Sequence, residues 1–320
     1  MSIRWTQKMV FLSILVGMIV FMNAWMDRGG NQQSRLQFEE AFHPKVNADM
    51  IIIGASHAGH GINPKYLERD GLKVFNFGTD GAGPYYFLKW YRKIFQRYYR
   101  KPETVIFGVH WVMFESHILQ RQLEQDSSYF PRHFLFEELH NFKEMKTLVL
   151  NQFAFIRERK KLPYRLVRIF EKERKKGPHI IAQYYNGFVP YERRGRLDKK
   201  KGSKPKNDIL QINAFKELLD EFEKNHIRVI LVSIPGYLPA RDADNIRESI
   251  ELIHTIAKEK NIPFLDYEMK RITDLNTDPS LFSDWVHLNG KGSDAFSKLL
   301  KSDLDLLLDS KKTRGGAPPT

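Results

Sequence analysis

The stretch that decides the fold is DMIIIGASHAGHG, Asp49 to Gly61, in which an apolar run ends at Gly54, Ala55 and Ser56. Four later runs are also rich in Val, Ile or Phe and are bounded by turn-forming residues: LKVFNFG (72–78), TVIFGVHW (104–111), IRVILVSIPG (227–236) and IPFLDY (262–267). Short apolar runs bounded in this way are typical of strands that are buried on both faces. The sequence therefore predicts five buried strands.

Helices are predicted between and after these strands, over Tyr85–Tyr99, Asp208–Asn225, Asp242–Lys260 and Gly292–Leu307. Alternation of strands and helices indicates right-handed βαβ units, and hence an α/β fold with a parallel sheet. In such folds the active site lies at the carboxyl ends of the strands.

Residues suited to acyl chemistry follow three of the predicted strands. Ser56 follows the first, Gly81 lies in the loop after the second, and Asp284 and His287 lie in SDWVHLNGKG (283–292) after the fifth. A serine hydroxyl becomes a strong nucleophile when a histidine accepts its proton, and an acidic group on the other ring nitrogen fixes the histidine tautomer. We therefore predict a catalytic triad of Ser56, His287 and Asp284.

The same chemistry requires donors for the oxyanion of the tetrahedral intermediate. Ser56 is expected at a strand-to-helix turn, where its own amide can serve as a donor. Gly81, in the loop after the second strand, permits close approach of a second backbone amide. We predict that the amides of Ser56 and Gly81 form the oxyanion hole.

At this point the chain resembles the SGNH/GDSL hydrolase superfamily. Gly54-Ala55-Ser56 matches its first block, NFGTDGAG (76–83) its second, and DWVHLNGKG (284–292) its Asp-x-x-His block. Gly81 is the preferred glycine of the second block, and Gly78 is the alternative. The resemblance covers about residues 49–109 and 228–300 and implies a three-layer, flavodoxin-like fold with a five-stranded parallel sheet.

The third block is where the chain departs from the superfamily. Members commonly carry an Asn there, whose side chain completes the oxyanion hole, whereas this chain reads GVHWVMF (108–114). His110 is one candidate for the missing donor, and a hole built from backbone amides alone is the other.

Three residues near the blocks, His57, Asn76 and Trp285, are candidate substrate-binding residues. The spacing of His57, His60 and His110 matches no strict metal-binding template. We therefore predict neither a metal site nor a cofactor.

The N-terminal run MVFLSILVGMIVFMNAWM (9–26) contains no charged residue. About 17–25 such residues span a bilayer core, and Arg4 and Lys8 before the run favour a cytoplasmic N-terminus. The sequence predicts a single-pass anchor in the cytoplasmic membrane, with the catalytic domain on the extracytoplasmic side, periplasmic or extracellular. A cleaved signal peptide is the alternative, but NAWMD (23–27) lacks a small-x-small cleavage site.

Charge and cysteine content limit the remaining possibilities. The 320 residues include no cysteine, which excludes thiol nucleophiles, thiolate metal sites and disulfides. The net charge is +13, and residues 157–206 hold 18 Lys and Arg against 5 Asp and Glu, so the whole excess lies in that segment. This segment is either a solvated insertion or a surface for anionic headgroups or an acidic glycan, and we expect it to do no chemistry. Nucleic acid is not an expected partner of an outward-facing domain.

These features predict the organisation of the chain. Residues 1–28 form a cytoplasmic stub and transmembrane anchor, residues 29–47 a juxtamembrane linker and residues 48–310 an SGNH-like domain. A basic helical insertion occupies about residues 112–206 of that domain, and residues 311–320 form a disordered tail.

One membrane span before an SGNH-like domain resembles the D-alanyl transfer protein of lipoteichoic acid modification and the O-acetylation proteins of alginate and other exopolysaccharides. The resemblance implies a multispanning membrane-bound O-acyltransferase as a partner. The leading hypothesis is O-acyl transfer, with acetyl as the leading acyl group, to a cell-surface or exported polysaccharide. A carbohydrate esterase or deacetylase with the same triad and a non-catalytic accessory subunit of an O-acyltransferase complex are the alternatives.

Overall fold

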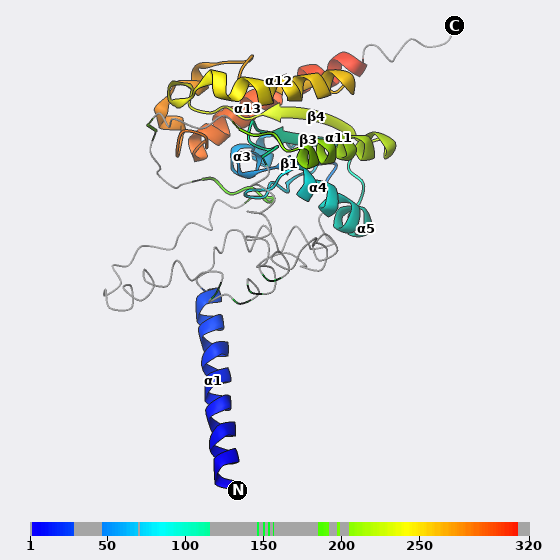
Figure 1. Cartoon of the computed structure of the whole chain (residues 1–320). Coiled ribbons are helices and arrows are strands. Elements are labelled where there is room, and N and C mark those ends of the chain that lie inside the picture. Colours follow the sequence, from blue (N-terminus) through cyan, green and yellow to red (C-terminus); the bar gives the residue numbers. More distant parts are fainter. Residues whose placement is uncertain are drawn as a thin grey trace. The chain divides into compact units, whose positions relative to one another are not determined.

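A computed structural model describes residues 2–28, 47–69, 71–115, 185–191, 197–198 and 205–312, together with Lys146, Leu150, Phe153 and Ile156. The chain divides into two compact units, of which one comprises residues 1–38 and 123–181 and the other residues 39–122 and 182–320. The second unit contains the whole sheet, and Figure 1 labels most of its helices and strands.

The five predicted apolar runs form the strands of one sheet. They are β1 (Met50–Gly54), β2 (Val74–Asn76), β3 (Thr104–Val109), β4 (Arg228–Ser233) and β5 (Phe264–Asp266). All neighbouring strands are parallel, and their order is β2-β1-β3-β4-β5. This is the flavodoxin-like order, in which the direction of the connections reverses between β1 and β3. The sequence-based prediction of the fold class is therefore confirmed.

The helices of the second unit lie between and after these strands. They are α3 (Ser56–Gly61), α4 (Pro84–Trp90), α5 (Gln96–Tyr98), α11 (Ile209–Lys224), α12 (Ala243–Glu259) and α13 (Gly290–Lys312). A π-helical turn, η2 (Tyr91–Phe95), joins α4 to α5. Short 3-10 turns are η1 (Pro64–Tyr66), η5 (Leu238–Ala240), η6 (Asp274–Asn276) and η7 (Pro279–Leu281). The helix predicted over residues 85–99 is thus interrupted by a π turn, which coincides with a series of stacked rings at Tyr91, Phe95 and Tyr99.

The connections place the helices in two layers, one on each face of the sheet. Right-handed crossovers that all step in one direction put α4, α11 and α12 on the same face, and the β1–β2 connection puts α3 on the other. Contacts agree with this: α11 packs on α4, ion pairs such as Lys216–Glu259 join α11 to α12, and α13 packs on α3.

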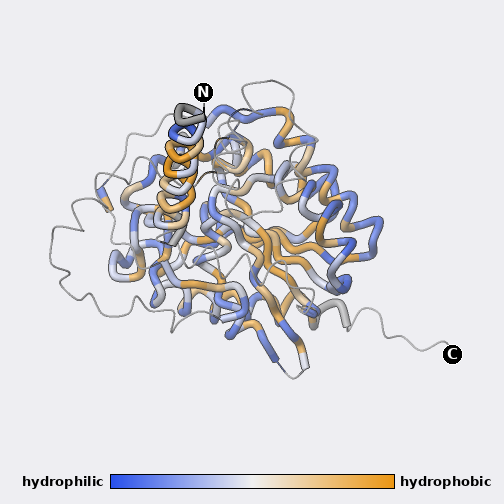
Figure 2. The backbone as a smooth tube through the Cα atoms, turned by 90° about the horizontal axis from the view of Figure 1, so that it is seen from below, coloured by the Kyte–Doolittle hydropathy of each residue, from blue (hydrophilic) through white to orange (hydrophobic). Residues whose placement is uncertain are grey.

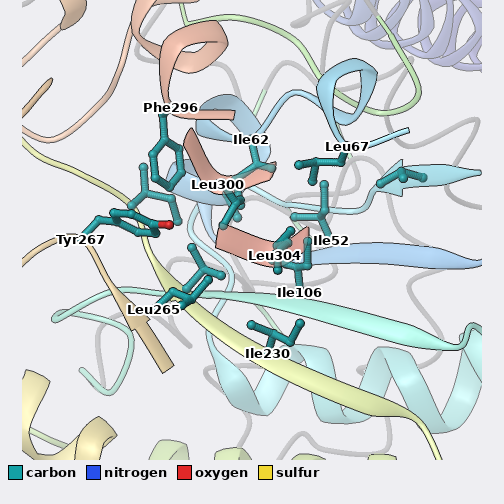
Figure 3. Packing of buried hydrophobic residues seen from close by; sticks show 14 of the residues in the cluster. Ile52, Ile62, Leu67, Ile106, Ile230, Leu265, Tyr267, Phe296, Leu300 and Leu304 are labelled. Carbon is teal, nitrogen blue, oxygen red and sulfur yellow. The ribbon is translucent and has the colours of Figure 1, made fainter. Parts of the chain in front are cut away.

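The core on the α13 side combines side chains from the strands with side chains at helical spacing on α13. Ile52, Ile106 and Ile230 project from three adjacent strands, and Phe296 and Leu300 follow at helical spacing on α13 (Figure 3). Each such buried side chain contributes about 1.5–3 kcal/mol relative to leaving it exposed. Figure 2 shows the strands in the colours of hydrophobic residues, as expected for strands that are covered on both faces.

The N-terminal helix α1 (Ser2–Arg28) carries the predicted span. Its segment Trp5–Met26 has 22 residues and a mean hydropathy of 2.1, which is long and apolar enough to cross a membrane. A signal sequence has the same properties, so the helix is an anchor or a signal sequence by length and composition.

Other predicted parts of the chain lie largely outside the described residues. Of the predicted linker only residue 47 is described, and of the predicted tail only residues 311 and 312. Within the predicted insertion the longest described stretch is 185–191.

Candidate active site

Ser56, His287 and Asp284 lie in a continuous line of hydrogen bonds. Ser56 begins α3 directly after β1, and its Oγ lies 2.9 Å from Nε2 of His287. Nδ1 of His287 lies 2.9 Å and 3.0 Å from the two carboxylate oxygens of Asp284. The structure therefore brings together the three residues that the sequence predicts as a triad.

The loop around Asp284 fixes the direction of this line. Oδ1 of Asp284 accepts hydrogen bonds from the backbone amides of Val286 (2.9 Å) and His287 (2.8 Å). Burial alone would raise the pKa of Asp284, but the hydrogen bonds from His287 and these amides outweigh it and hold the pKa below its ordinary value. The ionised carboxylate accepts the Nδ1 proton, so Nε2 of the neutral ring is the acceptor for the hydroxyl proton of Ser56.

The residues that follow His287 in the sequence block close the same loop. Nδ2 of Asn289 donates to the carbonyl of Ser280 (2.7 Å), and Oδ1 of Asn289 accepts from the amide of Gly292 (3.0 Å). A Cβ atom on Gly292 would lie 2.1 Å from the carbonyl oxygen of Leu281. Asn289 and Gly292 therefore hold the shape of the loop that carries Asp284 and His287.

The side chain of Asn76 makes its hydrogen bonds within the protein. Its Nδ2 donates to the carbonyls of Ala58 and Ile62, both at 2.8 Å, and its Oδ1 accepts from the amide of Gly78 at 2.8 Å. Asn76 thus ties α3 to the loop after β2, and its side-chain amide is used up within the protein. The alternative glycine, Gly78, has an amide that is already engaged, which disfavours it as an oxyanion donor.

Among the described residues no backbone hydrogen bond is made by the amide of Ser56 or of Gly81, so the role of both amides in the oxyanion hole stays a prediction. Gly81 has a φ of +69° in a turn that the Ala82 amide closes onto the Thr79 carbonyl (3.0 Å). A residue with a side chain is strained in this conformation, which explains the glycine.

Two buried histidines stack beside His287. The ring of His57 lies 4.6 Å from that of His287 and 3.6 Å from that of His110, centroid to centroid. Burial lowers the pKa of both His57 and His110 well below the ordinary value, and nearby positive groups such as Arg241 add to the effect. Both rings are therefore neutral near pH 7.

Strand register and close packing explain this stack. Gly54 of β1 pairs with Gly108 of β3, so Ser56 and His110 occupy equivalent positions beyond two adjacent strands. A Cβ atom on Gly108 would lie 2.5 Å from Cβ of Ala58. The glycine lets α3 pack directly on β3, which brings His57 onto His110 at the point where the direction of the connections reverses.

His110 presents an unused donor at this position. The amide of Val112 donates to Nδ1 of His110 (3.4 Å), so the neutral ring carries its proton on Nε2. That Nε2 atom is buried and has no hydrogen-bond partner among the described residues. A buried donor without a partner costs about 1–3 kcal/mol, which calls for an explanation such as a role in binding.

Two further features near the site carry no recognisable sequence motif. Tyr191 stacks on His287 at 4.6 Å and 21°, and Arg241 forms a buried ion pair with Glu268. Burial outweighs the opposing charge of Arg241, so the pKa of Glu268 is raised to about 7. Neither feature could be found from the sequence blocks, because the blocks contain none of these three residues.

The remaining residues that the sequence singled out are Trp285 and His60. The ring of Trp285 is half-buried and lies 6.3 Å from that of Trp111, and its role in binding stays a prediction. His60 faces Asp80 (2.8 Å) and does not contact the triad. Among the described residues no group of three or more His, Asp or Glu side chains is arranged to hold a metal ion.

The chain is similar to several solved structures, all at low sequence identity. The sequence matches no protein-family model and no curated protein. It is similar to a GDSL-like lipase from Bacteroides thetaiotaomicron, with 14% identity, 81% of this chain and 88% of that chain covered and a TM-score of 0.39. It is also similar to a lipase/acylhydrolase from Enterococcus faecalis (12%, 80% and 94%, TM-score 0.39) and to a variant of an acetyl-xylooligosaccharide esterase from Geobacillus (12%, 79% and 93%, TM-score 0.37).

Proposed function

We propose that this protein is a serine-dependent enzyme that acts on acyl esters. The observation that carries the proposal is the line from Ser56 Oγ through the imidazole of His287 to the carboxylate of Asp284. A hydroxyl, an imidazole and an ionised carboxylate in this order are the parts that nucleophilic acyl transfer requires.

In the first half of the reaction Ser56 takes the acyl group. Nε2 of His287 accepts the hydroxyl proton while Oγ attacks the acyl carbonyl carbon, and Asp284 stabilises the imidazolium. The tetrahedral intermediate then breaks its bond to the leaving oxygen, which receives the proton from His287. The result is an acyl-serine and a free alcohol.

The oxyanion of that intermediate needs donors that are in place before the reaction. The amides of Ser56 and Gly81 and the Nε2–H of His110 are the three groups that we assign to it. Because His110 follows β3 at the level of Ser56, it takes the place at which the superfamily commonly has an asparagine.

In the second half an acceptor hydroxyl attacks the acyl-serine and gives its proton to Nε2 of His287. The bond between the acyl carbon and Ser56 Oγ then breaks, and Oγ takes that proton, which releases the new ester and restores Ser56. We propose that the acceptor is a hydroxyl of a cell-surface or exported polysaccharide and that the acyl group is acetyl. This finer proposal draws on the resemblance to O-acetylation proteins and on the apolar helix α1, which suits a membrane anchor. It includes an extracytoplasmic domain and a membrane-bound O-acyltransferase as the acyl source.

Hydrolysis is the alternative, because water and a sugar hydroxyl attack the same acyl-serine. The experiment that tests the proposal compares ester-linked acyl groups on the surface polymer of the wild type and of a Ser56→Ala strain. Lost acylation supports transfer, and gained acylation supports an esterase. Unchanged acylation contradicts both and leaves a non-catalytic accessory role.

A further inference from the structure

Residues 185–191, here named the strap, belong to the basic segment 157–206, which we expect from the sequence to do no chemistry. Their first four residues form a tight turn, in which Tyr185 and Phe188 exchange backbone hydrogen bonds of 3.0 Å and 2.8 Å. The two central residues, Asn186 and Gly187, have φ angles of +44° and +84°. Asn and Gly adopt such angles most readily, so the local sequence specifies this turn.

The turn is fixed against β2 and the segment that precedes it. The carbonyl of Asn186 accepts from the amide of Asn76 (2.9 Å), and its side chain donates to Glu68 (2.9 Å). Tyr185 also donates to the Glu68 carboxylate. A Cβ atom on Gly187 would lie 1.9 Å from the carbonyl oxygen of Asn76, so the turn contacts the strand directly.

Beyond the turn, the strap is held by both elements that carry the triad. Nδ1 of His60, on the same helix as Ser56, donates to the carbonyl of Val189 (2.7 Å). Oγ of Ser283, which precedes Asp284, donates to the carbonyl of Tyr191. The strap therefore connects the serine side of the site to the histidine side.

The His60 contact is strengthened by charge. Its Nδ1 faces a carbonyl and its Nε2 faces the Asp80 carboxylate, and both of these groups accept hydrogen bonds. A ring that donates to both must be doubly protonated. Burial lowers the pKa of His60, but Asp80 outweighs it and the net shift is upward, which agrees with this protonation state.

At the end of the strap the ring of Tyr191 stacks on His287 with a centroid distance of 4.6 Å and an interplanar angle of 21°. His57 stacks on the same imidazole at 4.6 Å and 27°. The imidazole must keep one plane to serve Ser56 through Nε2 and Asp284 through Nδ1 at once. Flat rings that lie against it oppose rotation out of that plane.

We propose that Tyr191 is a positioning residue, whose ring holds the imidazole of His287 in the plane that serves both Ser56 and Asp284. This inference rests on the proposed serine-dependent function. It assigns a part in the reaction to the segment between β3 and β4, which supplies the strap and no reacting group.

The test uses the full-length chain in detergent micelles and two readouts: turnover of a small soluble acetyl ester and labelling of Ser56 by a phosphonate. Tyr191→Phe keeps the ring, Tyr191→Leu removes it, and Tyr191→Met is a second, more adaptable replacement. Tyr98→Leu is the matched control, because Tyr98 is exposed on α5. Melting temperatures identify any variant that fails to fold.

We expect Tyr191→Leu and Tyr191→Met to lower kcat by about 10- to 100-fold, the effect of a small misplacement of a reacting group. KM should change by less than about twofold, since no substrate contact is removed. Tyr191→Phe and Tyr98→Leu should resemble the wild type.

Wild-type kcat in both ring-free variants would overturn the inference, and so would a loss in Tyr191→Phe equal to that in Tyr191→Leu. If one ring-free variant does not fold, the other decides. The proposed function fails separately if Ser56 of the wild type is not labelled and the turnover of the wild type equals that of Ser56→Ala. That result would overturn the inference as well.

Discussion

Nε2 of His287 lies 2.9 Å from Oγ of Ser56, although 231 positions separate the two residues in the chain. The distance is that of a hydrogen bond between a hydroxyl donor and an imidazole acceptor. Because Nδ1 of the same ring faces Asp284, Nε2 is the atom that accepts the hydroxyl proton of Ser56. Ser56 is therefore the group whose reactivity the site controls.

Replacing His287 with Ala should slow phosphonate labelling of Ser56 by several orders of magnitude, as loss of a triad member does in other serine hydrolases. Asp284→Asn keeps the shape of the carboxylate but removes its charge, and should also be strongly impaired because the imidazolium is no longer stabilised. Mass spectrometry of the labelled peptide measures both. Equal labelling in wild type and His287→Ala would refute the triad.

His110 allows a separate test of the oxyanion hole. His110→Phe keeps a ring against His57 but has no donor, and should lower kcat about 10²- to 10³-fold with little change in KM. His110→Gln restores an N–H donor and should recover part of the loss. If Phe is tolerated and Gln is not, His110 serves packing alone and the hole consists of backbone amides.

The buried ring of His57 should make stability depend on pH. Its pKa is lowered in the folded state, so below about pH 6.5 the unfolded chain binds a proton that the folded chain does not. The stability that the neutral ring of His57 contributes is therefore fully present above the unfolded pKa and is lost as pH falls below it. Relative to His57→Phe, wild type should lose up to about 1.4 kcal/mol of unfolding free energy per pH unit below that point.

Urea unfolding of both proteins between about pH 7.5 and 5.5 measures this difference. The Phe variant keeps a flat ring in the stack but cannot titrate. Parallel pH dependences in the two proteins would show that His57 is not held neutral.

Gly187 offers a test of how tightly the strap contacts β2. Gly187 and Gly71 both have positive φ angles, but a Cβ atom on Gly187 would meet the Asn76 carbonyl at 1.9 Å, whereas one on Gly71 has open space. Gly71→Ala should lose about 1–2 kcal/mol of unfolding free energy from backbone strain alone. Gly187→Ala should lose clearly more, and should also lower kcat because the strap is displaced. Equal losses of stability would mean that the contact is easily relieved.

The apolar run of α1 leads to a topology test. With Arg4 and Lys8 in the cytoplasm, protease added outside intact spheroplasts should digest the domain that contains Ser56, while a cytoplasmic marker protein stays intact. Complete protection of the domain under the same conditions would reverse the proposed orientation.

Much of the fold could be predicted because its signals are local. The run Met50–Gly54 is apolar and bounded by turn-forming residues, the later runs repeat this pattern, and helical stretches alternate with them. Five buried, parallel strands therefore follow from short stretches read one at a time. The relation of Asp284 to His287 is equally local. Three residues apart in one turn, they meet through hydrogen bonds that the loop itself provides.

Asn76 and Gly78 show where local reading fails. The sequence offers Asn76 as a substrate contact and Gly78 as an oxyanion donor, yet in the fold the Asn76 side chain binds the Gly78 amide and two carbonyls of the segment after β1. Which amide remains free depends on which acceptor another part of the chain brings near it. A pattern of residue types along the chain does not contain the distance between that amide and its acceptor.

The sequence by itself therefore determined five buried parallel strands and the candidate serine, histidine and aspartate, because periodicity, turn residues and short spacings act between near neighbours. The tertiary structure gave the strand order β2-β1-β3-β4-β5. Only the tertiary structure decided that Ser56 reaches His287, that His57 and His110 stack beside it, and that Tyr191 lies against the imidazole. Ring stacking and hydrogen bonding act over a few ångströms in space, and the packing of α3 on β3 and of the strap on β2 sets those distances between segments that are remote in the chain.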